Sequence, residues 1–438
     1  MRKKKIKHPV YGIGEVVETR HKGFYKKVKF SDGIERVLRI DENIEELEEE
    51  ANLPVMPKQE ETEKSPEPFE KYDEPDKFRE KPLIMIETDR HKSRVMIEAF
   101  RCGIVPYDYV KDFVFGRDEE IIFIDKWLTE DTCIIRLFIN GLYGSGKTHL
   151  LHYIQWQALE KKYATAWIVV DPNETPFHKP KNVYLSLMQN FKYKNSETGK
   201  IENFYSFIKD IKEKAGSQLM DHFLFRKLQM ANINFNEKLF WNFLSFLEVR
   251  YLPPYSTAIN VYTNLLSSWG WFARTYLGLK GLILIFDEAE NIDINKYAYQ
   301  RQQSNEFLNA LFLMAKNDKN IGEVIPRCGK TPWKEIPFLY KTPAGLKLIF
   351  STTSSSWENE TEESSSVIKL NPISPSVLKD ISKRIYNLYL QAYNIQDRGN
   401  INHILREIAE KFIEKDSVST RQYIKGIVEY LDYLRFSK

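Results

Sequence analysis

Cysteine is scarce in this chain: its 438 residues include only Cys102, Cys133 and Cys328. Three cysteines so far apart argue against a disulfide framework, which needs pairs, and against a cysteine-based zinc site, which needs close spacing. Long apolar runs are also lacking, since none reaches the roughly 18 residues that a membrane-spanning helix needs. The first residues have no apolar core like that of a secretion signal. We therefore expect a cytoplasmic protein without a membrane segment.

The chain as a whole has little excess of either charge sign, since its formal net charge is +3, but two of its segments are strongly charged. Residues 1–30 carry ten Lys or Arg against two Glu, whereas residues 41–80 carry sixteen Asp or Glu against five basic residues. A basic segment favours a polyanionic partner such as nucleic acid. The alternative is a solvated terminus that only aids solubility, because most charged runs are simply wet surface.

What is present points first to a bound phosphate. Residues 140–150 read Asn-Gly-Leu-Tyr-Gly-Ser-Gly-Lys-Thr-His-Leu and fit the Gly-x-x-x-x-Gly-Lys-Thr pattern of a phosphate-binding loop. The apolar run Cys133 to Ile139 predicts the buried strand that such a loop follows. Backbone N–H groups would curl around phosphate oxygens, Lys147 would reach the β- and γ-phosphates, and Thr148 would offer its hydroxyl to magnesium. The predicted nucleotide contacts from this loop are Gly141, Tyr143, Gly144, Ser145, Gly146, Lys147, Thr148 and His149.

A second nucleotide motif lies further along the chain. Five apolar residues, Leu282 to Phe286, predict a buried strand that ends in Asp287 and Glu288. Asp287 can hold magnesium, and Glu288 can orient an attacking water as the catalytic base. Glu290 is expected to be a neighbouring or surface carboxylate. The predicted cofactors are ATP and Mg²⁺, with Thr148 and Asp287 as the metal ligands.

The order of the predicted elements is that of an α/β fold. Short apolar runs alternate with helical patterns, which predicts a parallel sheet with helices on both faces. An insertion at about residues 183–278 is rich in aromatic side chains, and its helical spacing favours core packing over base stacking. After the last strand the chain turns helical, which predicts a compact lid. The strands are expected at Cys133 to Ile139, Ala164 to Val170, Leu282 to Phe286 and Lys347 to Phe350; the aromatic residues include Trp241, Phe243, Phe246, Trp269 and Trp271; the lid helices are expected at Ser374 to Tyr393, Ile401 to Lys415 and Thr420 to Phe436.

The first 82 residues have a different character. Strand-forming residues and the turn Ser31-Asp32-Gly33 predict a small β module over residues 1–44. The stretches His8-Pro-Val-Tyr-Gly-Ile-Gly-Glu-Val-Val and Val28-Lys-Phe-Ser-Asp-Gly resemble the Tudor- or SH3-like barrel at the C-terminus of UvrD/PcrA-type helicases. That resemblance implies an adaptor that docks on protein or nucleic acid; a module that only packs on its own ATPase is the open alternative. Residues 45–82 have few apolar side chains and predict a flexible acidic linker.

Four stretches lie within residues 90–436: Ser93-Arg-Val-Met-Ile-Glu-Ala-Phe-Arg-Cys-Gly-Ile-Val-Pro106, Phe115-Gly-Arg-Asp-Glu-Glu, Gly141 to Leu151 and Gly278-Leu-Lys-Gly-Leu-Ile-Leu-Ile-Phe-Asp-Glu-Ala-Glu. Together they resemble the ATP-binding proteins of BREX-type bacterial defence islands. This second resemblance implies an AAA+-like P-loop ATPase core at residues 83–370 and a helical lid at residues 371–438. It also implies a homo-oligomer that acts on DNA, beside a helicase or other defence proteins. The N-terminal module departs from this family.

The AAA+-like architecture implies a polar sensor of the γ-phosphate at the end of the strand Lys347 to Phe350. Thr352 is our first choice for this catalytic role, with Ser351 and Thr353 as alternatives. All three belong to the Ser-Thr-Thr-Ser sequence that follows the strand.

The same architecture implies arginines near the nucleotide. Arg421, at the start of the last helix, would be a second catalytic sensor, unless it is an ordinary solvated residue. Arg117, in a Gly-Arg-x-x-Glu element, would lie near the base and ribose. Arg301 is a candidate for the arginine finger that a neighbouring subunit supplies.

Three functions fit these patterns. The first is an ATP-hydrolysing oligomeric motor or switch that acts on DNA or a DNA-bound partner. The second is a nucleotide-gated scaffold that binds ATP, rarely hydrolyses it and recruits a helicase or nuclease. The third is an origin-recognition-like DNA loader, which the absence of a winged-helix pattern after the lid disfavours.

Overall fold

The computed structural model describes the strands between Lys5 and Leu47 and most of the chain after residue 88. The chain divides into two compact units, Met1–Leu83 and Ile84–Lys438, which we describe separately. Predictions that lie outside the described residues concern most of the linker, the helix Ile401 to Lys415, and Trp241, Phe243 and Phe246. The described ranges of the second unit are 89–104, 107–130, 133–221, 259–294, 297–321, 340–353, 364–395 and 419–436.

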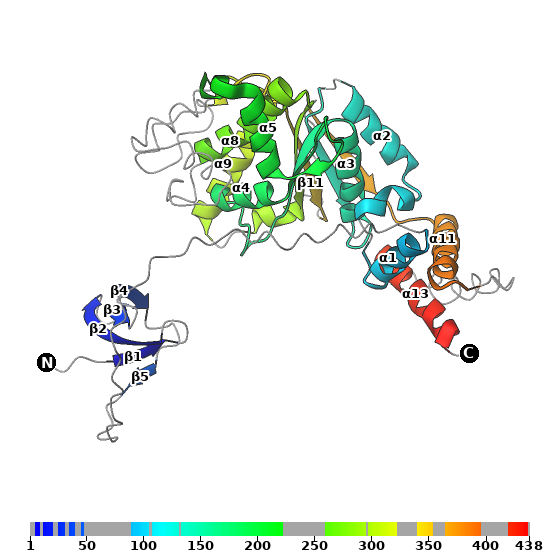
Figure 1. Cartoon of the computed structure of the whole chain (residues 1–438), viewed down its shortest axis with the longest axis horizontal. Coiled ribbons are helices and arrows are strands. Elements are labelled where there is room, and N and C mark those ends of the chain that lie inside the picture. Colours follow the sequence, from blue (N-terminus) through cyan, green and yellow to red (C-terminus); the bar gives the residue numbers. More distant parts are fainter. Residues whose placement is uncertain are drawn as a thin grey trace, which may run out of the picture. The chain divides into compact units, whose positions relative to one another are not determined.

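The first unit contains a five-stranded antiparallel sheet in the order β4-β3-β2-β1-β5 (Figure 1). β5 pairs with β1, so the sheet extends three residues into the segment that was predicted as linker. The predicted β module is thus present as a sheet, while the barrel and its Tudor- or SH3-like character stay predictions. The strands are β1 (Lys5–His8), β2 (Gly12–Arg20), β3 (Tyr25–Phe30), β4 (Glu35–Arg39) and β5 (Glu45–Leu47).

The second unit is built on a seven-stranded sheet in the order β12-β6-β11-β10-β7-β8-β9. The strands from β12 to β7 are parallel, and β8 and β9 add an antiparallel edge. β11 lies between β6 and β10, so its end is flanked by the ends of both motif strands. The four predicted strands are present as β6 (Arg136–Gly141), β7 (Tyr163–Val169), β10 (Gly281–Asp287) and β11 (Leu346–Thr352), whereas β8 (Phe191–Lys194), β9 (Ile201–Glu202) and β12 (Ser365–Leu370) were not predicted.

Side chains of β10 alternate between the two faces of this sheet. Leu282, Leu284 and Phe286 point into a core that helices α4, α5, α8 and α9 cover, whereas Ile283 and Ile285 point toward α2 and α3. By the same alternation the next residue, an aspartate, lies on the α3 face, where the phosphate-binding loop enters its helix. These helices are α2 (Asp118–Thr129), α3 (Lys147–Glu160), α4 (Pro180–Gln189), α5 (Phe204–Ala215), α8 (Ile259–Leu277) and α9 (Ala298–Ala315).

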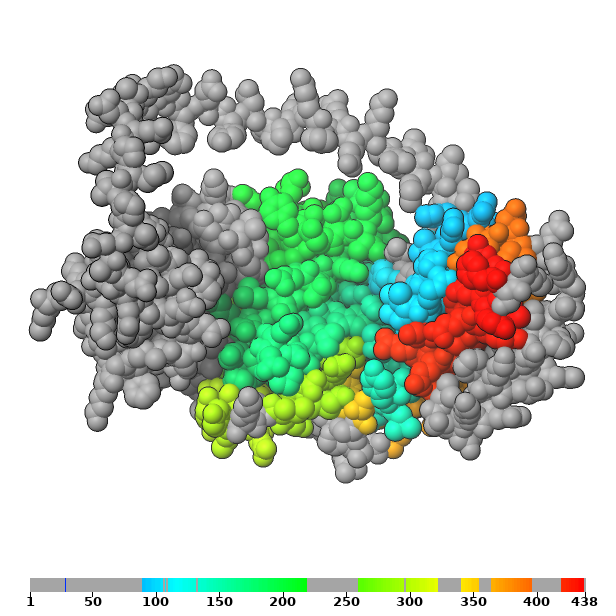
Figure 2. All heavy atoms as spheres, turned by 90° about the horizontal axis from the view of Figure 1, so that it is seen from below, coloured from blue at the N-terminus to red at the C-terminus, as the bar shows by residue number. Residues whose placement is uncertain are grey.

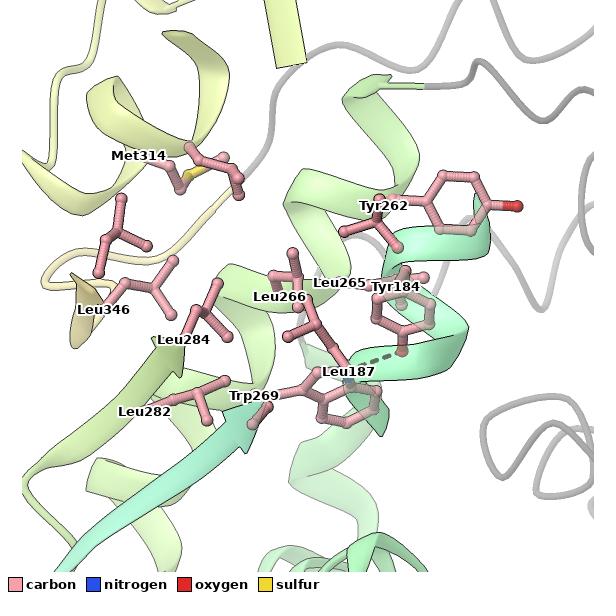
Figure 3. Packing of buried hydrophobic residues seen from close by; sticks show 14 of the residues in the cluster. Tyr184, Leu187, Tyr262, Leu265, Leu266, Trp269, Leu282, Leu284, Met314 and Leu346 are labelled. Carbon is pink, nitrogen blue, oxygen red and sulfur yellow. Dashed lines mark hydrogen bonds between the residues drawn. The ribbon is translucent and has the colours of Figure 1, made fainter. Parts of the chain in front are cut away.

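Aromatic residues of the insertion take part in the larger core. Figure 3 shows Trp269 of α8 beside Leu282 of β10. The indole is 1% exposed, and its Nε1 donates to the hydroxyl of Tyr184 across 2.9 Å. Core packing is therefore confirmed for Trp269, and Trp271 packs half-buried against the same cluster.

The lid is a helical bundle that includes the first helix of the unit. α1 (Asp89–Arg101) packs against α11 (Pro375–Tyr393) and α13 (Thr420–Phe436). In Figure 2 these helices, coloured blue, orange and red, form one mass. The chain therefore passes through this helical bundle before it enters the α/β core, whereas residues 83–100 were predicted to belong to the core.

Arg101, at the end of α1, ties this bundle together. Its guanidinium donates to both carboxylate oxygens of Asp432 on α13, at distances of 2.8 to 3.1 Å. It also donates to the hydroxyl of Tyr393, at 3.2 Å, and contacts Glu98. The hydroxyl of Tyr389 donates to Asp432 at 2.7 Å. One side chain thus joins all three helices.

Replacing Arg101 with methionine is expected to lower the free energy of unfolding by about 1–3 kcal/mol, because partly buried charge-assisted hydrogen bonds are lost. Urea denaturation measures this change. As a control, Lys383→Met removes an ion pair with Asp380 in which both side chains are more than half exposed. It should cost less than about 0.5 kcal/mol. Equal midpoints for the two variants would show that Arg101 does not hold the lid.

Candidate functional site

The phosphate-binding loop joins the end of β6 to the start of α3. Gly144 and Gly146 have φ angles of +78° and +96°, which residues with a side chain rarely adopt. A Cβ atom at Gly144 would also lie 2.6 Å from the Cβ of Ser419 in the lid. Glycine at these positions thus permits both the loop conformation and its close contact with the lid.

Lys147, the first residue of α3, is turned back onto the loop. Its Nζ donates to the carbonyl oxygens of Gly141, at 2.8 Å, and Leu142, at 3.2 Å. Burial lowers the pKa of Lys147, an effect that the nearby carboxylates oppose. A phosphate in the loop would give the ammonium a charged partner in place of two neutral carbonyls, which makes the stronger bond.

Thr148 and Asp287 bring the two motifs together. The Thr148 hydroxyl donates to Oδ2 of Asp287 across 3.0 Å. The aspartate is 4% exposed, and its Oδ1 accepts from the backbone N–H of Glu288 at 3.0 Å. Hydroxyl and carboxylate oxygens are the hard ligands that Mg²⁺ prefers, alongside water and phosphate oxygens. The donor set therefore fits the predicted magnesium.

Glu288 stands at a sharp turn directly after β10. Its φ of 53° and ψ of 43° lie in the left-handed region, which is uncommon for residues other than glycine and clusters at functional sites. The side chain is exposed and lines a cavity. Partial burial, and then the negative charges of Asp287 and Glu290, raise the pKa of Glu288 above its ordinary value. Such a carboxylate is suited to accept a proton from water.

Two hydroxyl groups at the end of β11 reach the same place. The Ser351 hydroxyl contacts the carboxylate of Asp287 and accepts from the backbone N–H of Glu288 at 3.3 Å. Thr353 lines the cavity, and its hydroxyl donates to Oε1 of Glu290 at 2.5 Å. Glu290 is therefore part of the site and not an isolated surface carboxylate.

Thr352, the first choice for the sensor, is placed differently. It is fully buried, pairs in register with Asn140, and is not among the residues that line the cavity. Its neighbours Ser351 and Thr353 point the other way because successive side chains of a strand face opposite sides of the sheet. The structure brings those two residues to the site and leaves Thr352 on the α8 and α9 side.

A cavity of about 440 Å³ lies between the core and the lid. Its polar lining includes the loop, Lys147 and the carboxylates of Asp287, Glu288 and Glu290. Its apolar lining comes from the segment after α1, the segment before α2, and the lid. A cation and an apolar wall in one cavity fit phosphates and an aromatic base. The apolar wall is made by Ile104, Phe113, Val114, Phe115, Ile373, Ile381 and Ile424.

Two other residues of the predicted loop set line the cavity less directly. Tyr143 is 77% exposed, and His149 lies in the wall beside His152. Burial lowers the pKa of His149 to about 4, so its imidazole is neutral near pH 7. Its Nε2 is buried and has no hydrogen-bond partner.

The three predicted arginines lie in different places. Arg117 lines the cavity, but its guanidinium donates hydrogen bonds to the backbone carbonyls of Ser145 and Asn371. Arg421 also lines the cavity, and its Nε donates to the carbonyl of Gly103 at 2.9 Å. Arg301 lies exposed on α9 and does not line the cavity.

The apolar wall of the cavity was not predicted from the sequence. Its residues come from four separate segments of the chain. Ile104 and Phe115 belong to stretches whose only signal in the sequence was the family resemblance.

The sequence matches the family of BREX system ATP-binding proteins BrxC/D over residues 88–246 and 271–437. The chain belongs to this family. The BrxC/D match includes the phosphate-binding loop, Asp287, Glu288 and the lid helices, whereas the unit Met1–Leu83 lies outside it. ATP is thus the nucleotide that the family description names.

A comparison with curated proteins gives no match. Among solved structures, this BrxC/D chain is similar to a DNA replication initiation factor, with 12% identity, a TM-score of 0.33, and 75% of this chain and 65% of that one covered. It is similar to AMPPCP-bound DnaA from Aquifex aeolicus, with 11% identity, a TM-score of 0.31, and coverage of 75% and 66%. The third is Cdc6p from Pyrobaculum aerophilum, with 14% identity, a TM-score of 0.33, and coverage of 74% and 62%.

This BrxC/D chain spans slightly less than two thirds of the length of each of these three proteins. Within its described residues, no helix combines the length and apolar character needed to cross a membrane.

Proposed function

We propose that this BrxC/D protein is a cytoplasmic, magnesium-dependent ATPase of the AAA+ type. It would act in anti-phage defence as an oligomeric switch or motor on DNA or on a DNA-bound partner such as a helicase. The observation that carries the proposal is the 3.0 Å contact between Thr148 Oγ1 and Asp287 Oδ2, with Lys147 and Glu288 in the same cavity. That arrangement supplies a phosphate site, a metal site and a base.

Each of these residues would have a distinct role in ATP hydrolysis. The loop amides and Lys147 hold the phosphates, and Thr148 and Asp287 hold the metal, which when bound neutralises phosphate charge. Glu288 orients a water and takes its proton. The apolar wall and the lid helices exclude bulk water from the cavity.

Sensing of the γ-phosphate would fall to Thr353 and not to Thr352. Thr353→Val is expected to lower kcat by about tenfold while leaving ATP affinity nearly unchanged, because only a contact made during reaction is lost. The matched change Thr352→Val replaces the same hydroxyl by a methyl group on a side chain outside the cavity, and it should leave kcat within about twofold. Steady-state phosphate release on both variants measures this. A larger loss for Thr352→Val would return the sensor to the residue first predicted.

Phosphate release from ATP by purified full-length protein tests the function itself. Mg²⁺-dependent release that EDTA abolishes is expected. To locate any nucleic-acid contact, the effect of duplex DNA on phosphate release is compared between the full chain and a chain that begins at Ile84. Stimulation by DNA that is lost in the shorter chain assigns the contact to the first unit; stimulation that is retained assigns it to the ATPase unit. No release under any condition, with ATP bound, contradicts the ATPase.

One observation favours the alternative of a nucleotide-gated scaffold with little hydrolysis. Among the described residues, the arginines that line the cavity are Arg117 and Arg421, and each bonds to backbone carbonyls. Each guanidinium therefore has a donor engaged by the backbone before any phosphate binds, whereas Lys147 is turned onto the loop itself. Turnover that rises with protein concentration would support an oligomeric ATPase that borrows an arginine such as Arg301, while slow turnover at every concentration would support the scaffold.

A further inference from the structure

Arg117 is an almost fully buried arginine whose bonds join distant parts of the chain. It is 8% exposed, and its Nη2 donates to the carbonyl oxygens of Ser145 and Asn371, each at 2.9 Å. Its Nη1 bonds to Oε1 of Glu120 at 3.1 Å, which holds the guanidinium in place. One nitrogen therefore connects the phosphate-binding loop to the strand exit 226 residues further along.

The contact with Ser145 fixes the direction of a loop amide. The peptide between Ser145 and Gly146 is trans, so its carbonyl and its N–H point in opposite directions. The carbonyl bonds to Arg117 behind the loop, and the N–H of Gly146 is therefore directed the other way. The glycine on its C-terminal side, Gly146, tolerates many backbone conformations and makes this peptide easier to rotate. A fixed carbonyl removes that freedom.

The contact with Asn371 fixes the path into the lid. β12 ends at Leu370 and α11 begins at Pro375, so residues 371–374 form a short stem that connects the core sheet to the lid. Ile373 of this stem belongs to the apolar wall of the cavity. A shift of the Asn371 carbonyl would therefore move the stem and the helix α11 that follows it, and with them the apolar wall of the cavity.

We propose that Arg117 is a positioning residue that couples the phosphate-binding loop to the lid stem, and that it does not contact the nucleotide. Phosphate binding that displaces the loop carries the Ser145 carbonyl with it, and the bonded guanidinium passes this movement to Asn371. The planar fork is needed because a lysine ammonium cannot span two carbonyls and a carboxylate in one plane. The inference rests on the proposed nucleotide site.

Hydrogen exchange on the full chain, with and without Mg²⁺ and the non-hydrolysable analogue AMPPCP, tests this coupling. In the wild type, the analogue should slow amide exchange in residues 141–150 and in the stem. In Arg117→Lys, loop protection should remain while stem protection falls by at least about tenfold. Lys126→Met, an exposed change on the same helix α2, should behave like the wild type. Glu120→Gln keeps the guanidinium but loosens its anchor, so it should give a smaller loss and serves if Arg117→Lys fails to fold.

Each outcome has one meaning. Equal stem protection in Arg117→Lys and wild type overturns the coupling. A proportional loss in loop and stem, with weaker analogue binding, means that Arg117 contacts the nucleotide and also overturns it. Wild-type protection of the loop without the stem overturns the coupling but leaves the nucleotide site standing. Absence of any protection in the wild type overturns the nucleotide site and the coupling with it.

Discussion

Glu288→Gln is expected to lower ATP turnover by at least about 100-fold while ATP affinity changes by no more than about twofold. Glutamine keeps the size of the side chain and its place after β10 but cannot take a proton from water. The raised pKa of Glu288, caused by partial burial and by Asp287 and Glu290, keeps the carboxylate basic enough for that task. Phosphate release gives turnover, and titration with a fluorescent ATP analogue gives affinity.

The neighbouring carboxylate provides the matched control. Glu290 lines the same cavity, but its Oε1 already accepts a hydrogen bond from the Thr353 hydroxyl. Glu290→Gln should reduce turnover by less than about tenfold. If Glu290→Gln proves the more damaging change, the base has been assigned to the wrong residue, and if both variants turn over like the wild type, neither carboxylate is the base.

Lys147→Ala is expected to weaken ATP binding by at least about 100-fold, because the variant lacks the ammonium that lies on the loop carbonyls of Gly141 and Leu142 and would pair with a phosphate. In the structure its Nζ already lies 2.8 Å from the Gly141 carbonyl, so no large movement is needed for it to reach a phosphate. Isothermal titration with ATP and Mg²⁺ measures the change.

Lys126→Ala is the control for this variant, since that side chain is 64% exposed on α2 and forms its ion pair with Glu130. It should bind ATP like the wild type. Circular dichroism of both variants separates a lost contact from a lost fold. Binding by Lys147→Ala within about threefold of the wild type would contradict the assignment of the phosphate site.

The interior strands could be predicted because strands of a parallel sheet are buried on both faces and read as continuous apolar runs. β12 was missed because Ser365 and Ser366 open it and Lys369 interrupts it at the sheet edge. The β8 and β9 hairpin was missed because its few residues lie in an insertion whose aromatic spacing reads as helical. The place of α1 in the lid depends on contacts between the two ends of the second unit, which no local sequence pattern contains.

In the candidate site, residues within a known motif could be predicted, whereas residues whose place depends on strand register could not. The phosphate-binding loop and the Asp287-Glu288 pair have patterns that name their chemistry. Thr352 and Thr353 have none, and choosing between them needs the parity of β11, because a shift of one residue moves a side chain to the other face. Arg117 was expected beside the nucleotide, and only the folded chain reveals that its donors are taken by two backbone carbonyls.

The most direct test is the identity of the nucleotide retained after incubation with ATP and Mg²⁺. Wild-type protein and Glu288→Gln are separated from free nucleotide by rapid gel filtration, denatured, and their bound nucleotide is resolved by ion-exchange chromatography. We expect ADP on the wild type and intact ATP on Glu288→Gln. Intact ATP on both would support the scaffold, whereas ADP on both, or no nucleotide on either, would contradict the site described here.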